Sequence, residues 1–194
     1  TKDIKTHKDY TETLCPGKDL YKHFEDGSFI KMVESELNPS TQIISSKVKT
    51  GIEVLRDRNF DILKGKRVGL VTNPTGIDSK LKSTIDILFE AKEVNLTALY
   101  GPEHGVRGNY SAGDLVDFYV DDATKLPVYS LYGKTRKPTA EMLKDVDVIV
   151  FDIQDIGSRS YTYISTMGLV MEAAAENNKE VVILDRPNPL GGNR

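Results

Sequence analysis

The chain has 194 residues, of which 39% are hydrophobic and 28% charged, a composition typical of a folded globular protein. Its 26 basic and 29 acidic residues give a net charge of −3 without a run of five or six like charges, which argues against nucleic acid as a partner. Cys15 is the single cysteine, so the chain can form neither an internal disulfide nor a cysteine-ligated metal cluster, and no apolar stretch is long enough for a membrane span.

Residues 1–50 differ in composition from the remainder, because they are rich in Lys, Asp and Thr and lack an extended apolar run. Ile30, Val33 and Leu37 recur at helical spacing before a proline, which predicts a short helix. We therefore predict a helical N-terminal extension and linker over residues 1–50 and an α/β domain over residues 51–194.

Five short runs in the second region are rich in Val, Ile, Leu and Tyr and show no strict polar alternation. This pattern is typical of strands covered on both faces, as in a parallel sheet. The runs are Arg67 to Thr72, Leu96 to Tyr100, Pro127 to Leu131, Val146 to Ile153, and Glu180 to Leu184.

Helix-like segments alternate with these runs. Ser83 to Ala91 opens with a capping serine, Thr139 to Lys144 follows a proline, and Thr162 to Asn177 is the longest. Strands alternating with helices predict a three-layer α/β fold with a mainly parallel sheet of about five strands. In the longest helix we expect one core-facing stripe, made of Ile164, Met167, Met171, Ala174 and Ala175.

Ligands of open parallel sheets bind beyond the carboxyl ends of the strands, where loops and helix N-termini converge. The segments that follow the five predicted strands are all rich in Gly, Pro and polar side chains, whereas the loops at the opposite ends are plain polar turns. These segments are residues 73–76, 101–108, 132–138, 154–163 and 186–192.

The segment GPEHGVRG, residues 101–108, is the most suggestive of the five. It places Glu103 and His104 side by side between glycines, directly after a predicted strand. Glycine on both sides lets such a loop turn sharply and approach a ligand. A carboxyl group and an imidazole at this position predict acid–base chemistry, although a solvent-facing turn is the plain alternative.

Several common motifs are absent. Gly133-Lys134-Thr135 resembles the end of a phosphate-binding loop, but Val128 stands where that motif requires glycine, and neither a dinucleotide fingerprint nor a serine-hydrolase elbow is present. We expect no cofactor. Glu103, His104, Asp152 and Asp155 could converge on a metal ion, but the three histidines form no paired motif, so we favour a site without metal.

An acid–base centre remains. Glu103 is the predicted proton donor, with Asp152, Asp155 or a tyrosine completing the pair. We predict that polar substrate groups are held by Asn73, Arg159 and Arg186. Each of these secondary residues has a structural alternative, since Asp152 and Asp185 could tie loops together and Arg186 could pair with one of them.

Five strings resemble the exo-β-N-acetylmuramidase (NamZ) family, bacterial glycoside hydrolases that release N-acetylmuramic acid from non-reducing ends of peptidoglycan fragments. They are GKRVGLVTNPTG (65–76), YGPEHGVRG (100–108), LPVYSLYGKTRKPT (126–139), VDVIVFDIQDIGSRSYTYISTM (146–167) and LDRPNPLGG (184–192). The resemblance runs from about Gly51 to Gly192 and does not include residues 1–50.

The resemblance implies a Rossmann-like catalytic domain over residues 51–194, joined in family members to a smaller C-terminal domain across an active-site cleft. It implies that Glu103 is the catalytic acid and that His104 orients it or the sugar. The family's Q-D-[IV]-G-x-R-x-Y-T-Y segment falls on Asp155, Arg159, Tyr161 and Tyr163, with Ser160 where a bulky aromatic residue is expected.

Such an enzyme protonates a poor leaving oxygen while positive charge grows on the sugar ring. Asp155, Tyr163 or the substrate's own N-acetyl group is expected to stabilise the anomeric carbon, and Arg159 or Arg107 to bind the lactyl carboxylate of muramic acid. The expected substrates are peptidoglycan-derived muropeptides or disaccharides. With this resemblance, the expected location is secreted or periplasmic; no signal peptide is visible in the sequence, but a cleaved one would leave no trace. A non-catalytic sugar-binding module and a metal-dependent hydrolase are the alternatives.

Overall fold

The computed structural model describes residues 26–29, 31, 48–108, 118–158 and 160–191. The chain divides into two compact units, Thr1–Lys47 and Val48–Arg194. Ile30, Val33 and Leu37, on which the predicted N-terminal helix depends, lie outside the described residues. The second unit contains the sheet and all the predicted site residues.

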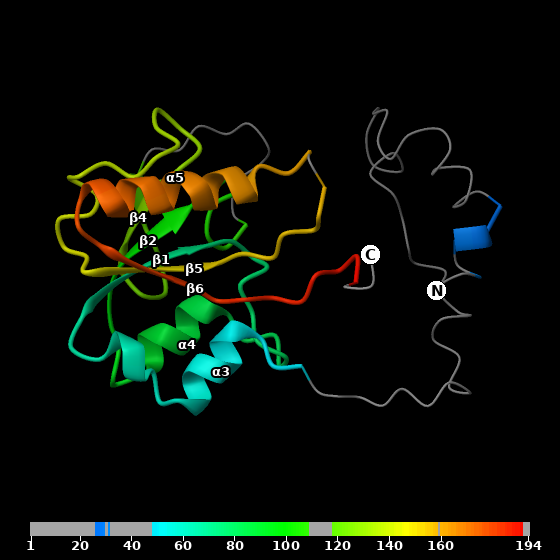
Figure 1. The fold of residues 1–194 in the computed structure, drawn as a ribbon, viewed down its shortest axis with the longest axis horizontal. Helices are drawn as coiled ribbons and strands as arrows, with labels where there is room; N and C mark the ends of the chain where they lie inside the picture. Colours follow the sequence, from blue (N-terminus) through cyan, green and yellow to red (C-terminus); the bar gives the residue numbers. More distant parts are fainter. Residues whose placement is uncertain (1–25, 30, 32–47, 109–117, 159, 192–194) are drawn as a thin grey trace. The chain divides into compact units, whose positions relative to one another are not determined.

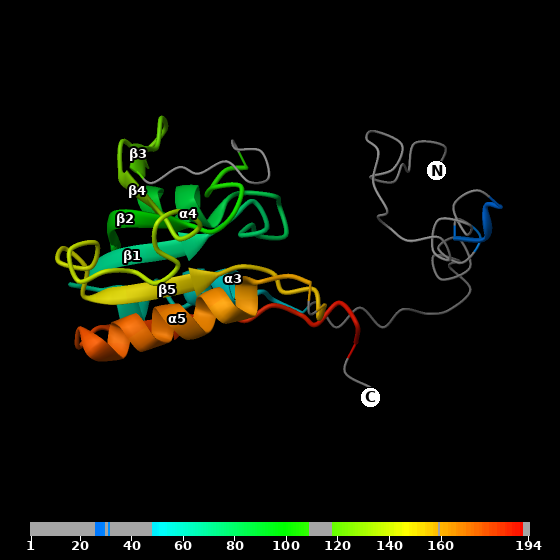
Figure 2. The ribbon, with the colours of Figure 1, turned by 90° about the horizontal axis from the view of Figure 1, so that it is seen from above.

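The second unit is built on a six-stranded sheet with the order β3-β4-β2-β1-β5-β6 (Figures 1 and 2). The predicted runs are confirmed as five parallel strands: β1 (Arg67–Thr72), β2 (Asn95–Gly101), β4 (Pro127–Ser130), β5 (Val148–Asp152) and β6 (Glu180–Ile183). The sixth strand, β3 (Phe118–Val120), was not predicted and pairs antiparallel with β4 at one edge. The five parallel strands direct their carboxyl ends to one edge of the sheet.

Helices cover both faces of this sheet, which confirms the three-layer α/β prediction. Figure 1 shows α5 (Tyr163–Glu176) on one face and both α3 (Gly51–Asp57) and α4 (Thr84–Glu90) on the other. Ser83 caps α4 as expected, because its side chain accepts a hydrogen bond from the Asp86 N–H at 3.0 Å. A short 3₁₀ turn, η2 (Asp61–Leu63), leads into β1.

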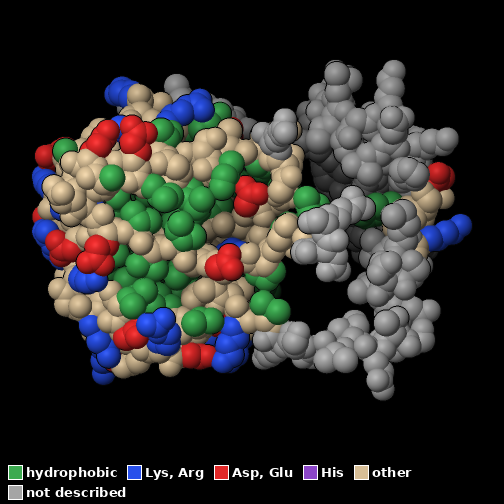
Figure 3. All heavy atoms as spheres, viewed as in Figure 1, with side chains coloured by type: hydrophobic (Ala, Val, Ile, Leu, Met, Phe, Trp, Pro, Cys, Tyr) green, Lys and Arg blue, Asp and Glu red, His purple; other side chains and the backbone are tan. Residues whose placement is uncertain are grey.

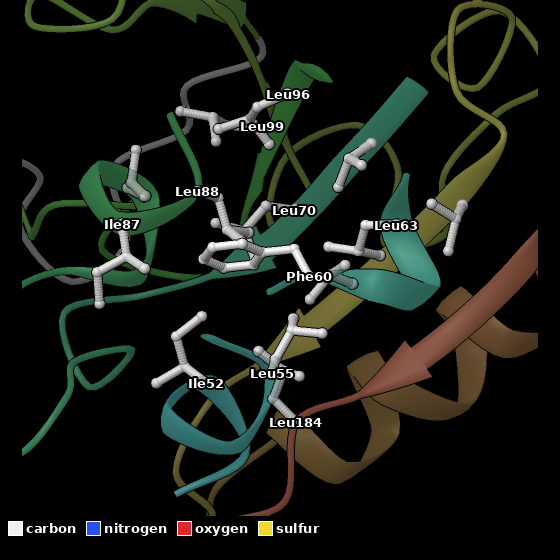
Figure 4. Packing of buried hydrophobic residues seen from close by; sticks show 14 of the residues in the cluster. Ile52, Leu55, Phe60, Leu63, Leu70, Ile87, Leu88, Leu96, Leu99 and Leu184 are labelled. Carbon is white, nitrogen blue, oxygen red and sulfur yellow. The ribbon is translucent and has the colours of Figure 1, made fainter. Parts of the chain in front are cut away.

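Two apolar clusters fill the spaces between the layers. In the first, Ile52 and Leu55 of α3 and Leu88 of α4 pack with Phe60 against Leu70 of β1, as Figure 4 shows. The second cluster lies beneath α5 and contains Ile149 and Phe151 of β5. Strand β1 is central, with its residues from Val68 onward buried, so the edge of the sheet where the loops meet rests on a closely packed base.

The predicted core face of α5 is partly wrong. Ala174 is buried and Met167 is half-buried against the second cluster, but Ile164 and Met171 are 57% and 46% exposed, and Ala175 is exposed as well. The residues buried against the sheet are Thr166, Val170, Ala173 and Ala174. Two apolar stripes share this helix, and the one with small residues lies inward because Ala173 and Ala174 allow close approach to the sheet. Hydrophobicity alone does not distinguish between the two stripes.

The predicted helix from Thr139 to Lys144 is also wrong. Hydrogen-bonded turns occupy this segment, with the Leu143 N–H shared between the Thr139 and Ala140 carbonyls at 3.2 Å. The segment is too short for a stable helix, and tertiary contacts determine its conformation instead. Leu143 is fully buried, and the Tyr100 hydroxyl donates to the Met142 carbonyl at 2.6 Å.

Candidate active site

The Glu103 loop begins at the carboxyl end of β2. The Gly105 N–H donates to the Pro102 carbonyl at 3.1 Å, which closes a turn with Glu103 and His104 at its centre. His104 has a φ of 73°, a left-handed conformation that costs a residue other than glycine about 1 kcal/mol. The sequence therefore keeps a histidine where the backbone favours glycine, and such strain is often found at functional loops.

The turn is anchored on both sides. A Cβ atom at Gly101 would lie 3.2 Å from the Gly105 Cα, so a larger residue there would push the two ends of the turn slightly apart. Val106 is buried in the first core cluster. The backbone on both sides of Glu103 is therefore fixed by packing.

Arg107 ties this loop to two other elements. Its Nε donates to Asp121 Oδ1 at 2.7 Å, and its Nη2 donates to Asp86 Oδ1 at 2.8 Å. Asp86 lies in the first turn of α4, and Asp121 directly follows β3. The hydrogen bonds from Arg107 hold the pKa of Asp86 below its usual value; for Asp121, burial acts to raise the pKa, but the bonds from Arg107 and Thr124 lower it overall.

Arg107 thus uses its guanidinium N–H groups for hydrogen bonds within the protein. The pKa of Arg107 is raised by the hydrogen bonds to Asp121 and Asp86, so the side chain is a permanent cation between two carboxylates. Binding of a substrate carboxylate by Arg107 stays a prediction, and in this arrangement it would require the guanidinium to share its donors.

A small hollow surrounds Glu103. It encloses about 10 Å³ at the ends of β2 and β4, and Tyr119, Ser130 and Tyr132 line it opposite the glycine-flanked turn. Glu103 is half-buried, and within the described part of the chain its carboxylate has no hydrogen-bond or ion-pair partner. None of the four hydroxyl residues of the lining, which also includes Tyr129, was predicted from the sequence as part of the site. Ser130 and Tyr132 stand at a predicted strand end, which is a signal that could have found them.

Asp155 and Tyr163 lie in a different cavity. This groove, of about 350 Å³, lies between the ends of β5 and β6 and the start of α5, and it also contains Gln154 and Arg186. Figure 3, in which the β6 edge faces the viewer, shows hydrophobic side chains on this side of the molecule. Tyr161 is exposed, and its ring centroid lies 6.1 Å from that of Tyr163.

The structure therefore separates the predicted acid from its predicted partners. Strand β1 lies between β2 and β5, and neighbouring strands are about 4.8 Å apart, so the two strand ends are separated by roughly 10 Å. Asp155 is half-buried, and its Oδ1 accepts a hydrogen bond from the Gly157 N–H at 2.6 Å. Arg159 lies outside the described residues.

Asp152 and Arg186 form an internal ion pair, which is the structural alternative raised for them. Arg186 Nε and Nη2 donate to the two carboxylate oxygens at 2.7 and 3.0 Å, and Nη2 also donates to the Ile77 carbonyl. The Thr84 hydroxyl donates to the same carboxylate, which is fully buried. The pair joins the ends of β5 and β6 to the start of α4. The substrate-binding roles of Asp152 and Arg186 stay predictions.

Asn73 organises the loop after β1. It is buried, and its Oδ1 accepts hydrogen bonds from the N–H and hydroxyl groups of Thr75. The Thr75 hydroxyl in turn accepts the Gln154 N–H at 2.9 Å, which connects the loops after β1 and β5. A polar network thus connects the loop after β1 to Gln154 at the Asp155 groove. Substrate binding by Asn73 stays a prediction.

Within the described ranges, no group of three or more His, Cys, Asp or Glu residues is placed to hold a metal ion. No helix there is long and apolar enough to cross a membrane.

A mostly parallel α/β sheet with polar loops at its carboxyl edge defines a Rossmann-like domain. Residues 68–194 match the family described as "Exo-beta-N-acetylmuramidase NamZ, N-terminal", and the chain belongs to this family. It is 60% identical over 147 residues to the "Peptidoglycan beta-N-acetylmuramidase NamZ" of Bacillus subtilis (strain 168), a match that covers 76% of this chain and 36% of that protein.

Two crystal structures of DUF1343 family proteins from Bacteroides fragilis NCTC 9343 are also similar. One is 70% identical with a TM-score of 0.69, over 75% of this chain and 36% of that chain. The other is 40% identical with a TM-score of 0.62, over 74% of this chain and 36% of that chain. The chain thus spans little more than a third of the length of these relatives.

Proposed function

We propose that this chain is the acid-bearing domain of a peptidoglycan glycosidase, in which Glu103 protonates the leaving oxygen as N-acetylmuramic acid is released from a non-reducing end. The family and the name of the Bacillus relative support the substrate class. The observation that carries the proposal is that Glu103 is a half-buried carboxyl group without an internal partner in the described residues.

Three other carboxylates near this edge are held in ion pairs, and Asp155 accepts a hydrogen bond from the Gly157 N–H. Asp152 is bound by Arg186, while Asp86 and Asp121 are bound by Arg107. A carboxylate in an ion pair is held in its charged form and is a poor proton donor near neutral pH. Glu103 is free to exchange a proton with a substrate, and the fixed backbone around it holds the group in one place.

The substrate is proposed to lie across the loop that follows β1, between the two cavities. In this position the leaving oxygen faces Glu103, and the sugar ring extends toward Asp155 and Tyr163. The separation of the two carboxyl groups decides between inversion, at about 6.5–9.5 Å, and retention, at about 5–5.5 Å.

The hollow at Glu103 is too shallow to enclose a sugar, since it holds only about 10 Å³. We propose that the wall above it is supplied by polypeptide that corresponds to the part of the relatives outside the match. The expected site of action is outside the cytoplasmic membrane, where peptidoglycan lies.

The test is the Glu103→Gln variant of the natural full-length protein, compared with Glu93→Gln as a matched control. Glu93 is exposed and lies in the loop before β2, at the opposite edge of the sheet. Loss of a general acid typically lowers kcat by about 10²–10⁴-fold, whereas the control should keep wild-type kcat. The loss at Glu103 should be smaller for an aryl leaving group, which needs less protonation, than for a natural disaccharide.

Near wild-type turnover of the disaccharide by Glu103→Gln would contradict the proposal. Binding of N-acetylmuramic acid by the wild-type protein without any hydrolysis would favour a sugar-binding module instead.

A further inference from the structure

Among the described residues, the arginines nearest to the two cavities are largely occupied by internal carboxylates. Arg107 is held between Asp86 and Asp121, and Arg186 is held by Asp152. A substrate that carries its own carboxylate needs a guanidinium with free donors, because a fork of N–H groups binds a carboxylate in two parallel hydrogen bonds. Arg136 is the described arginine near the Glu103 hollow that has such donors.

Arg136 lies in the loop after β4, and its side chain stacks on Tyr132. Its Cζ atom is 5.3 Å from the centroid of the Tyr132 ring, within the range of a cation–π contact. Arg136 is exposed, and the described part of the chain places no carboxylate at ion-pair distance from it. Because stacking uses the face of the guanidinium, the N–H donors in its plane stay available.

The backbone on the C-terminal side of Arg136 is held in place. The Thr135 hydroxyl donates to the Lys137 carbonyl at 2.6 Å and accepts the Lys137 N–H at 3.2 Å, which folds the chain around Arg136. The Lys137 ammonium is bound by Glu172 and Glu176 of α5 at 2.9 Å. These contacts anchor the loop to the helix and leave Arg136 directed over the Tyr132 ring.

Tyr132 is also a wall of the hollow that contains Glu103. Its N–H donates to the Ser130 hydroxyl at 3.1 Å, which fixes it at the end of β4. The stacked guanidinium therefore stands at the rim of the Glu103 hollow. Within the described residues, the hollow and its rim therefore offer the unpaired Glu103 carboxyl group and the unpaired Arg136 guanidinium, each on an anchored loop.

We propose that Arg136, supported by the Tyr132 ring, binds the carboxylate of the substrate and gives the Glu103 site its preference for carboxylate-bearing amino sugars. This rests on the proposed function, because it assigns the lactyl carboxylate of muramic acid to a residue of the same site. Arg136 is a specificity residue under this proposal, and Glu103 performs the proton transfer.

The kinetic test compares two chromogenic glycosides that share a leaving group, one of N-acetylmuramic acid and one of N-acetylglucosamine, which lacks the carboxylate. For Arg136→Gln in the natural full-length protein, we expect kcat/KM on the muramic acid glycoside to fall by roughly 10- to 100-fold, mainly through KM. Turnover of the glucosamine glycoside should change less than about twofold, so the preference between the two sugars collapses.

Matched variants separate this effect from a general loss of the surface. Arg136→Lys keeps the charge but loses the fork and should retain only part of the preference. Tyr132→Phe keeps the aromatic ring and should retain most of the preference between the two sugars, whereas Tyr132→Leu should lose it. Arg58→Gln is the control, since Arg58 is an exposed arginine paired with Asp61 beyond α3 and should leave both substrates unaffected. An unchanged preference in Arg136→Gln, or an equal loss on both glycosides, would overturn the proposal.

A binding measurement keeps this test separate from the proposed function. If the wild-type protein hydrolyses neither glycoside, the proposed function fails, and the Arg136 proposal is then judged by NMR of the arginine Nε–Hε signals. Free N-acetylmuramic acid should shift the Arg136 signal, while N-acetylglucosamine should leave it in place. Equal shifts with both sugars, or no shift with either, would overturn the assignment of Arg136.

Discussion

Replacement of Asp121 by Asn is the sharpest test of how the Glu103 loop is held. Asp121 is 3% exposed and receives four hydrogen bonds: two from Arg107, at 2.7 and 3.2 Å, and two from the N–H and hydroxyl groups of Thr124. An asparagine keeps the shape but removes the charge, and its amide group cannot accept from Arg107 on both sides. The variant therefore leaves the guanidinium of Arg107 only half paired.

The expected cost follows from the burial of the two partners. Removing one member of a buried ion pair typically costs 3–5 kcal/mol. Arg107 is 25% exposed and keeps Asp86 as a partner, and the Thr124 donors can still bind the asparagine oxygen, so we expect a smaller loss of about 2 kcal/mol. For a unit of this size, the corresponding decrease in Tm is about 4–8 °C.

The stability loss of Asp121→Asn should depend on pH. The pKa of Asp121 lies below its ordinary value of 3.8 in the folded protein, because the bonds from Arg107 and Thr124 outweigh the effect of burial. A carboxyl group whose pKa is lowered by folding stabilises the fold above its unfolded pKa, and this contribution is lost as the pH falls through the folded pKa. The difference in free energy of unfolding between wild type and Asp121→Asn should therefore reach its full value near pH 6 and decrease below about pH 4.

Two assays check this account. Urea unfolding at several pH values gives the stability difference, and hydrogen exchange reports whether the amides of Gly105 and Val106 open more readily. The control is Asp147→Asn, which breaks a more exposed ion pair with Arg67 at the opposite edge of the sheet and should not affect these amides. The reasoning is refuted if the Gly105 and Val106 amides exchange no faster in Asp121→Asn than in the control. It is also refuted if the stability loss of Asp121→Asn is unchanged at pH 3.

Two further substitutions test the buried ion pair at the site and a strained residue in the loop before α4. Arg186→Gln should lower the free energy of unfolding by about 3–5 kcal/mol, because it leaves the fully buried Asp152 carboxylate without its cation. Adding Asp152→Asn should recover part of this loss. Additive losses of the two variants in urea unfolding would contradict the pairing. Leu81→Gly should raise stability by about 1 kcal/mol, since Leu81 is 77% exposed and has a φ of 62°; a decrease in Tm would argue against strain at this position.

The five parallel strands could be predicted from the sequence because each is covered on both faces and therefore reads as a continuous apolar run. Strand β3 could not, because it has only three residues, Phe118 and Val120 are exposed, and it is held at the sheet edge by pairing with β4. The stripe of α5 that faces the sheet depends on close approach at Ala173 and Ala174, a property of packing that a hydrophobic period does not contain.

The site, like the fold, could be predicted only in part from the sequence. The Glu103 loop could be located because glycines flank it at a strand end, and strand ends are where loops meet. The wall formed by Tyr119 depends on the unpredicted strand β3. The carboxylate partners of Arg107 lie 14 and 21 residues away, and that of Arg186 lies 34 residues away, so only the folded chain brings these charges together.

A crystal structure of the natural full-length Glu103→Gln variant with an N-acetylmuramic acid glycoside bound tests the central claim most directly. The account predicts that the glycosidic oxygen lies within hydrogen-bond reach of the residue 103 side chain, about 2.6–3.2 Å, with the sugar across the loop that follows β1. A sugar seated elsewhere, with its glycosidic oxygen beyond the reach of residue 103, would contradict it.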